Sequence, residues 1–348
     1  MTLVVNHLMF VFRHTLKWPA ALLLATLFLL SGCLNESPQI YSIQGLTMGT
    51  TYTVKLVASS EPNNLKADID RALNAVNQSM STYLPDSELS RINQAAVGTK
   101  HQLSAGLSLV LALAQKISAE SEGAFDITVG PLVNLWGFGP DGRVIKAPLP
   151  SEIAAAGARV GYSKINLSEH TLSKEVDHYL DLSAIAKGYG VDVIAGLLEA
   201  KGYQNYLVEI GGELRANGVK PDGQNWHIAI ETPTELLVHQ VQKIIAVKNI
   251  GIATSGDYRN YFEENGVRFS HTINPKTGRP IGHNLASVTV LAQSCAEADA
   301  YATALMVMGP DAGYQFAQKQ NIDAFFIVKS ADGFKEIVTP GFQHYLVR

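Results

Sequence analysis

The stretch from residue 254 to residue 309 constrains the fold more than any other part of the chain. Its middle, residues 270–280, reads Ser-His-Thr-Ile-Asn-Pro-Lys-Thr-Gly-Arg-Pro. The pairs Asn-Pro, Thr-Gly and Arg-Pro can continue neither a helix nor a central strand, so this segment must be a loop. We expect His271 to enter that loop from a strand. The sequence therefore predicts a histidine held between rigid turns.

A helix is predicted to follow this loop. Residues 297–304 read Glu-Ala-Asp-Ala-Tyr-Ala-Thr-Ala, and neither Gly nor Pro follows them before Gly309. Asp299 and Thr303 are four residues apart, so they lie on one face of the helix. A carboxylate and a hydroxyl placed in this way can offer two hard oxygens to one cation. Taken alone, such a pair is more often a solvated helix face, and a lone histidine is more often structural.

The composition indicates a globular protein. The 348 residues suffice for one large domain or two medium ones, and 47% hydrophobic residues allow a sizeable core. The net charge of −4 lacks the basic surface that nucleic acids require, so we expect no nucleic-acid partner. Helical and strand-like segments are mixed without a regular βαβ alternation, and no linker or repeat divides them. We expect an α+β fold, a single domain with a mixed, mostly antiparallel sheet and packed helices.

The N-terminus has the features of a bacterial lipoprotein. Arg13 and Lys17 precede an apolar run from Trp18 to Leu30, which is short for a membrane span but typical of a signal-peptide core. The run ends in Leu-Ser-Gly before Cys33, which resembles a lipobox. The resemblance implies cleavage before Cys33 and lipid attachment to it. The alternative is an uncleaved anchor with an incidental cysteine.

The domain boundaries follow from this leader. We expect residues 1–32 to be the signal peptide, residues 33–40 a lipid-anchored leader and residues 41–348 the folded domain. Once Cys33 is assigned, only Cys295 remains, so no intramolecular disulfide can form. We expect Cys295 to be a small buried residue at the start of its helix.

The remaining elements are predicted from periodicity and capping signals. A turn at residues 48–50 leads into a strand at 52–57, and a short strand at 180–182 precedes a helix capped by Ser183. Apolar residues at helical spacing predict a helix through residues 65–76 and another, capped by Ser104, through 107–117. Further strands are expected at 206–210, 226–230, 243–248 and 324–328, and a further helix at 311–320.

Two segments could contact a ligand. Residues 123–139 contain several glycines, which let the backbone approach a ligand, and Phe125, Trp136 and Phe138 offer flat apolar surfaces. The same residues could equally be core and turn material. The helix start after residue 183 exposes amides suited to a phosphate, and Lys187 adds positive charge. This segment matches neither a Walker loop nor a dinucleotide fingerprint.

Taken together, the ordered motifs resemble the ApbE family. They are Met-Gly-Thr at 48–50, Ser-Thr-Tyr at 81–83, the run 124–138, Asp-Leu-Ser-Ala-Ile-Ala-Lys-Gly at 181–188, Glu-Ile-Gly-Gly at 209–212, Thr-Ser-Gly at 254–256, and the segments 271–280 and 297–303. The resemblance covers essentially everything after the signal peptide. It implies an α+β core that resembles the tunnelling fold.

The resemblance also implies an activity. Members of the ApbE family are FAD:protein FMN transferases, which split FAD at its pyrophosphate, attach FMN through a phosphoester to a threonine or serine of a target protein, and release AMP. They require Mg²⁺. Their targets are subunits of membrane redox complexes such as the sodium-pumping NADH:quinone reductase (Nqr) and the Rnf complex. We therefore expect a lipid-anchored protein facing the periplasm, at the inner membrane, although Leu34 is not the aspartate associated with inner-membrane retention.

The site residues carried over from the family are named here by their positions in this chain. Asp299 and Thr303 match side-chain metal ligands, and Ala184 matches a position that offers its backbone carbonyl to the same ion. Some members have a second Asp where this chain has Ala302, so a single Mg²⁺ suits this site better than two. Positions that hold FAD are matched by Met48, Tyr83, Ala124, Phe125, Asp126, Asp181, Lys187 and Thr272.

His271 is the preferred general base, because the intrinsic pKa of histidine lies near working pH and its loop could aim it at an incoming hydroxyl. His283 and Asp181 are weaker rivals. Two other functions remain open: an FAD pyrophosphatase that uses water as nucleophile, and a flavin-binding lipoprotein without chemistry. An envelope adhesion module would leave the glycine-rich and histidine motifs unexplained.

Overall fold

The computed structural model describes residues 37–142, 144, 146–233, 241–257, 261–264 and 267–347. The predicted signal peptide, Cys33 and most of the leader lie outside these residues. Within the described ranges, no helix has both the length and the apolar character needed to cross a bilayer. The first strand begins at Gln39.

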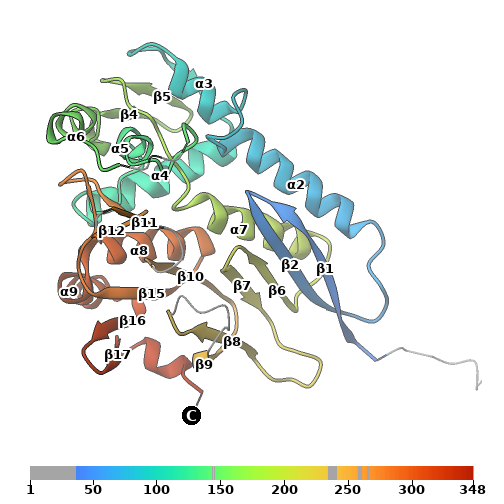
Figure 1. Cartoon of the computed structure of the whole chain (residues 1–348). Coiled ribbons are helices and arrows are strands. Elements are labelled where there is room, and N and C mark those ends of the chain that lie inside the picture. Colours follow the sequence, from blue (N-terminus) through green and yellow to red (C-terminus); the bar gives the residue numbers. More distant parts are fainter. Residues whose placement is uncertain are drawn as a thin grey trace, which may run out of the picture.

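An eight-stranded sheet is the centre of the fold (Figure 1), and every pairing between its strands is antiparallel. The predicted α+β class with a mostly antiparallel sheet is therefore confirmed. In sheet order the strands are β1 (Gln39–Thr47), β2 (Thr50–Ala58), β6 (Tyr206–Ile210), β7 (Glu213–Asn217), β10 (Ile250–Gly256), β15 (Leu285–Ala292), β16 (Asp323–Ser330) and β17 (Gly333–Val338).

Both faces of the sheet are covered, which explains why its central strands are apolar on both sides. Seven of the eight residues of β15 are buried. Apolar side chains of α2 (Leu65–Met80), α7 (Ala186–Ala200), α8 (Cys295–Met308) and α9 (Pro310–Gln320) cover one face. A hairpin of β8 (Trp226–Glu231) and β9 (Val241–Val247) covers the other face together with the turn η2 (Phe342–Tyr345). Figure 1 shows the two layers on opposite sides of the sheet.

A second group of short elements lies beyond the helical layer (Figure 1). It contains α3 (Glu88–Gln94), α4 (Ala105–Glu120), α5 (Gly130–Leu135), α6 (Pro150–Gly157), η1 (Tyr162–Lys164) and the small sheet of β3 (His101–Gln102), β5 (Thr171–Lys174) and β4 (Ile165–Leu167). The hairpins β11 (Tyr261–Glu264) with β12 (Val267–Ser270) and β13 (Ile273–Asn274) with β14 (Arg279–Pro280) meet this group.

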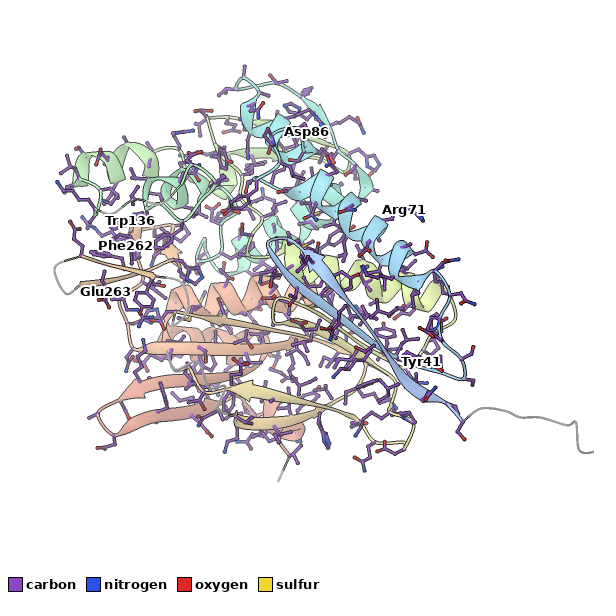
Figure 2. All side chains as sticks on the ribbon, turned by 45° about the vertical axis from the view of Figure 1, so that its right-hand side comes forward. Tyr41, Arg71, Asp86, Trp136, Phe262 and Glu263 are labelled. Atoms are coloured by element: carbon purple, nitrogen blue, oxygen red, sulfur yellow. The ribbon has the colours of Figure 1, made fainter. Side chains whose placement is uncertain are left out.

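An aromatic cluster joins α5 to the hairpin β11–β12. The Trp136 ring lies 6.4 Å from that of Phe262 and 5.5 Å from that of Phe269, and Figure 2 shows Trp136 and Phe262 beside each other. The Trp136 indole donates a hydrogen bond to the Gly278 carbonyl at 2.8 Å. Trp136, from the glycine-rich segment 123–139, thus packs against the hairpin β11–β12 and is hydrogen-bonded to the loop that follows His271.

Most predicted elements are present. The apolar residues expected on one face of α2 are buried, and Ser104 caps α4 by accepting the Leu107 N–H. The histidine loop leaves strand β12, as expected, and α8 runs until Gly309. Cys295 is the first residue of α8 and is fully buried.

The prediction around Ser183 is wrong in two respects. No strand forms at residues 180–182, and α7 begins at Ala186 after Ile185, which provides no side-chain cap. The Ser183 hydroxyl instead donates to the Asp181 carboxylate at 2.6 Å, and the same oxygen accepts the Ser183 N–H. Such an Asx turn competes with the capping role of a serine.

Candidate functional site

A cavity of about 900 Å³ opens between the helical layer, the sheet and the hairpin β8–β9. Twelve of the thirteen predicted site residues line it: Met48, Tyr83, Ala124, Phe125, Asp126, Asp181, Ala184, Lys187, His271, Thr272, Asp299 and Thr303. The thirteenth, Cys33, lies outside the described residues. His283, the rival base, is not among the lining residues, and neither is Trp136, which belongs to the core. Segments far apart in the sequence therefore converge on one cavity.

The floor of the cavity is formed where α7 and α8 nearly touch. A Cβ atom on Gly188 would lie 2.4 Å from the Cys295 carbonyl oxygen, and one on Gly251 would lie 2.4 Å from the Cys295 nitrogen. Real Cβ contacts are essentially never this short, so a side chain at either position would force the surrounding backbone to shift. The N-terminal turn of α8 is thus seated directly against α7 and β10.

The two helices cap each other. The Gly188 N–H, in the first turn of α7, donates to the Asp299 carboxylate of α8 at 3.1 Å. In return Asp192 of α7 accepts the N–H groups of Cys295 and Ala296 at 3.0 and 2.9 Å. A carboxylate at a helix N-terminus satisfies unpaired donors and complements the helix dipole. This exchange explains why α7 does not use Ser183 as its cap.

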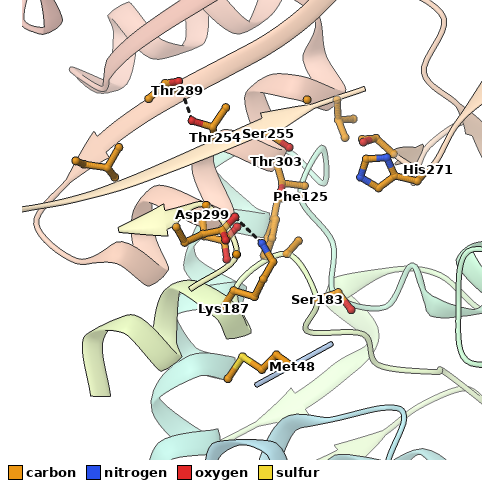
Figure 3. A pocket seen from close by; sticks show the side chains of 18 of the residues that line it. Met48, Phe125, Ser183, Lys187, Thr254, Ser255, His271, Thr289, Asp299 and Thr303 are labelled. Atoms are coloured by element: carbon orange, nitrogen blue, oxygen red, sulfur yellow. Dashed lines mark hydrogen bonds and ion pairs between the residues drawn. The ribbon is translucent and has the colours of Figure 1, made fainter. Parts of the chain in front are cut away.

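Charged groups are concentrated on this floor (Figure 3). The Lys187 ammonium lies 2.5 Å from the Glu213 carboxylate, and the Glu213 side chain is only 5% exposed. Burial lowers the pKa of Lys187, but the charges of Glu213 and Asp299 outweigh it and raise that pKa above its usual value. Burial raises the pKa of Glu213 and of Asp299, although the Lys187 charge acts against it. Two carboxylates therefore share one ammonium.

This floor suits a divalent cation. When all three groups are ionised, the cluster carries an excess of negative charge, and the second oxygen of Glu213 has no hydrogen-bond partner among the described residues. Asp299 and Thr303 line the cavity one helical turn apart, and Ala184 is also among the lining residues. Oxygen donors of this kind, completed by substrate oxygens, are those that Mg²⁺ prefers. Within the described ranges no group of three or more His, Cys, Asp or Glu forms a metal site, as expected for a set with one carboxylate.

Ala302, which stands where some relatives have an aspartate, is buried and does not line the cavity. The expectation of a single ion stays a prediction.

Two of the predicted FAD-binding residues, Asp126 and Asp181, make hydrogen bonds that order the loops lining the cavity. Asp126 accepts the Thr128 N–H and hydroxyl with one oxygen and the Tyr162 N–H with the other. Burial raises the pKa of Asp126, although these hydrogen bonds act against it. Asp181 closes the Asx turn with Ser183. Both carboxylates thus have internal hydrogen bonds that order the loops facing the ligand.

The cavity mouth is formed by Met48 and Tyr83. Met48 and Gly49 are the two turn residues between β1 and β2, with φ of 50° and 71°, which the type I′ turn of a tight hairpin requires. The Met48 side chain packs against Gly190, where a Cβ would lie 2.8 Å from its terminal carbon. Tyr83 is 64% exposed, which leaves its ring free to stack on a flat ligand.

His271 lies at another part of the cavity from Lys187 and Asp299 (Figure 3). Its ring meets the Phe138 ring edge to face, with the centroids 6.4 Å apart. The next residue, Thr272, is buried, and its carbonyl accepts the Ile281 N–H across the loop. The histidine is thus held by its loop and by an aromatic neighbour.

Two functional residues were missed by the sequence reasoning. Glu213 directly follows the Glu-Ile-Gly-Gly motif at residues 209–212 but is not part of it, and Asp192 is an ordinary helical residue in the sequence. The only signal for Glu213 was its position directly after two glycines, which here have φ of 57° and 101° and form a two-residue hairpin turn. Asp192 had no local signal, because its partners lie in other elements: Arg215 in β7, and Cys295 and Ala296 in α8.

Comparisons with known proteins point to one family. The sequence profile of the ApbE family matches residues 48–326. A FAD:protein FMN transferase of Vibrio cholerae serotype O1 is 47% identical over 334 residues, which cover 95% of this chain and 99% of that protein. A FAD:protein FMN transferase of Haemophilus influenzae is 48% identical over 317 residues, covering 88% and 91%.

Solved structures agree with the sequence comparison. The flavin transferase ApbE from Vibrio cholerae superposes with a TM-score of 0.83 at 45% identity, covering 89% of this chain and all of that one. The apo form of the Pseudomonas stutzeri flavinyl transferase ApbE superposes with a TM-score of 0.82 at 42% identity, covering 88% and 97%. Nearly the whole described fold is therefore shared with these proteins.

Proposed function

The chain belongs to the ApbE family, and we propose that its cavity splits the pyrophosphate of FAD and transfers the FMN half to a threonine or serine hydroxyl of a target protein. The activity is that of a FAD:protein FMN transferase. The observation that carries the proposal is the convergence on one cavity of twelve residues, spread from Met48 to Thr303, that match the family's site.

The balanced reaction is a phosphoryl substitution. The acceptor oxygen forms a bond to the FMN phosphorus, the bond from that phosphorus to the bridging oxygen breaks, and AMP leaves with the bridging oxygen. The acceptor loses its proton to a base. Three obstacles must be lowered: the negative charge of the pyrophosphate, the weak nucleophilicity of an alcohol and the departure of a phosphate.

Asp299, Thr303 and the Ala184 carbonyl would hold Mg²⁺. When bound, the ion supplies charge neutralisation at the pyrophosphate and at the leaving phosphate. Lys187 provides a fixed positive charge on the same floor, because Glu213 holds its ammonium at 2.5 Å. Because the backbone of α8 packs directly against Gly188 and Asp299 accepts the Gly188 N–H, the position of Asp299 relative to Lys187 is fixed. The chain therefore brings charge to the pyrophosphate on rigid helices.

His271 is the proposed general base. It lines the cavity from a loop that the Thr272 carbonyl and the Trp136 indole fasten to its surroundings. A neutral imidazole there could accept the acceptor's proton near neutral pH. Loss of His271 is expected to slow transfer at least about a hundredfold while FAD still binds.

A mass measurement tests the function. The protein is incubated with FAD, Mg²⁺ and the soluble domain of an Nqr- or Rnf-type subunit, and the acceptor is weighed. We expect it to gain the mass of FMN minus water, with AMP released in equal amount, and an acceptor with threonine replaced by alanine to gain nothing. Free FMN and AMP with an unchanged acceptor would instead indicate a pyrophosphatase. FAD recovered intact would indicate a binding protein without chemistry.

The proposed cellular setting is the periplasmic side of the inner membrane. The lipobox-like sequence before Cys33 supports a lipid anchor, and acceptor subunits of Nqr or Rnf type are membrane proteins. Radiolabelled fatty acid should be incorporated into the wild-type protein but not into Cys33→Ala. Labelling of both proteins would contradict this anchor.

A further inference from the structure

The outer edge of strand β1 has no partner in the described part of the chain. β1 ends the eight-stranded sheet and pairs along all nine residues with β2 on its inner side only. One face of β1 packs towards α2, where Tyr41 and Ile43 join the apolar cluster. Figure 1 shows β1 as the outermost strand on that side. The strand therefore presents a full-length edge.

The register shows which backbone groups this edge offers. Thr47 and Thr50 close the two-residue hairpin, so they form a hydrogen-bonded pair, and such pairs recur at every second residue. On the far side of β2, the Thr51 carbonyl and the Val57 N–H bond to the chain around β6, which fits this alternation. The N–H and C=O groups of four residues of β1 consequently point outwards: Ile40, Ser42, Gln44 and Leu46.

The edge lacks the features that normally protect such strands. Natural edges carry charges, prolines or bulges that prevent another chain from pairing with them. Residues 39–47 contain no charged residue and no proline, and the pairing with β2 has no bulge. The opposite edge of the sheet, β17, contains Lys335 and Glu336, and Glu336 is held by Gln242 and Lys243. Neither edge strand has a second strand partner in the described part of the chain, but β17 carries charges and β1 does not.

The open edge leads directly to the cavity. Thr47, the last residue of β1, is followed by Met48, which lines the cavity mouth. Leu46, whose backbone faces outwards, has a side chain that is 81% exposed. No residue of β17 lines the cavity. A strand paired with β1 would need only one or two further residues, at about 3.3 Å each, to pass from Leu46 to the turn at Met48.

We propose that an extended segment of the acceptor protein pairs with the outer edge of β1 as a ninth strand and so delivers its hydroxyl-bearing residue to the cavity. Main-chain hydrogen bonds give affinity in this mode of recognition and impose little side-chain sequence. The inference rests on the proposed transferase function, because it names how that function's protein substrate is held.

A pair of substitutions isolates the backbone contact. Ser42→Pro removes one outward N–H, and proline is tolerated at edge positions whose N–H faces away from the sheet. Ser42→Ala removes the same hydroxyl but keeps the N–H, so it is the matched control. Gln44→Pro and Gln44→Ala repeat the comparison two residues closer to the cavity. For each variant the KM for a folded Nqr- or Rnf-type acceptor domain, the KM for FAD and kcat are measured.

We expect each proline to raise the KM for the acceptor between about twofold and tenfold, the usual value of one hydrogen bond. The KM for FAD, kcat and the alanine variants should match the wild type. An unchanged KM for the acceptor in both proline variants would overturn the proposal, as would an equal rise in the alanine variants. If the KM for FAD rises equally, the turn at Met48 is distorted and the edge has no docking role.

Two other results can be told apart from a failure of the docking proposal by these measurements alone: the absence of any FMN transfer, and pairing of β1 with a second copy of the chain. If the wild-type protein fails to transfer FMN at all, the proposed function fails rather than the docking edge. If sedimentation shows a dimer of this chain that Ser42→Pro dissociates, β1 pairs with a second copy and the acceptor assignment is wrong.

Discussion

Replacing Gly188 by alanine should slow FMN transfer about a hundredfold without unfolding the protein. The new Cβ would lie 2.4 Å from the Cys295 carbonyl oxygen, 2.7 Å from its carbonyl carbon and 2.8 Å from the Ala296 Cα. All three are backbone atoms, so α7 and α8 must move apart by about 1 Å to reach ordinary contact distances. This movement would stretch the Gly188–Asp299 hydrogen bond and carry Asp299 away from Lys187.

The expected magnitudes follow from this geometry. Overpacking costs about 1–3 kcal/mol, and the better helix propensity of alanine returns about 1 kcal/mol, so the protein should remain folded. A displacement of about 1 Å between reacting groups can slow catalysis about a hundredfold. We therefore expect kcat to fall about a hundredfold, with a higher Mg²⁺ concentration needed for half-maximal rate.

Gly196→Ala is the matched control, because Gly196 lies in the same helix and a Cβ there meets nothing within 4 Å. It should stabilise the protein by about 0.5–1 kcal/mol and leave transfer unchanged. Urea denaturation and acceptor flavinylation, measured on both variants, test the argument. A Gly188→Ala protein with wild-type kcat and Mg²⁺ dependence would refute the idea that the α7–α8 contact sets the site.

Four other outcomes are expected. Asp299→Asn should abolish Mg²⁺-stimulated transfer yet melt no lower than the wild type without Mg²⁺, because a costly buried charge is removed; undiminished Mg²⁺ activation would speak against this ligand. Glu213→Gln should lower the free energy of unfolding in urea by about 1–3 kcal/mol, less than for a fully buried pair because Lys187 is 31% exposed. Asp192→Ala should cost about 1–2 kcal/mol, because the N–H groups of Cys295 and Ala296 and the Arg215 guanidinium lose their acceptor while Ser294 still caps α8, and an unchanged melting temperature would contradict this. Burial raises the pKa of the Cys295 thiol, so iodoacetamide at pH 8 should modify it only after unfolding; rapid labelling of Cys295 itself in the folded protein, located by peptide mass so that Cys33 is told apart, would be inconsistent with its position.

Much of the site could be predicted because its signals are local. The four-residue spacing of Asp299 and Thr303 needs only a helix, and α8 supplies it. The histidine loop is shaped by Pro275, Gly278 and Pro280, which exclude a helix or a long strand, although the two-residue strands β13 and β14 pair within it. Family resemblance then assigned roles that spacing alone could not.

The missing parts depend on contacts between distant segments. Ser183 has the composition of a cap, but Asp299, more than 100 residues later, reaches the first turn of α7 instead. Glu213 becomes a partner of Lys187 only because β7 lies next to α7 in the folded chain. Two of the four outward residues of the edge strand β1, Ile40 and Leu46, are apolar, so the alternation of polar and apolar residues gave only a weak signal for this strand.

The most direct test of the cation site is anomalous diffraction from crystals grown with FAD and Mn²⁺ in place of Mg²⁺. The account predicts one strong peak within about 2.5 Å of the Asp299 carboxylate, the Thr303 hydroxyl and the Ala184 carbonyl, with the FAD phosphates completing its ligands. A peak elsewhere in the cavity, or no peak while FAD is clearly bound, would contradict it.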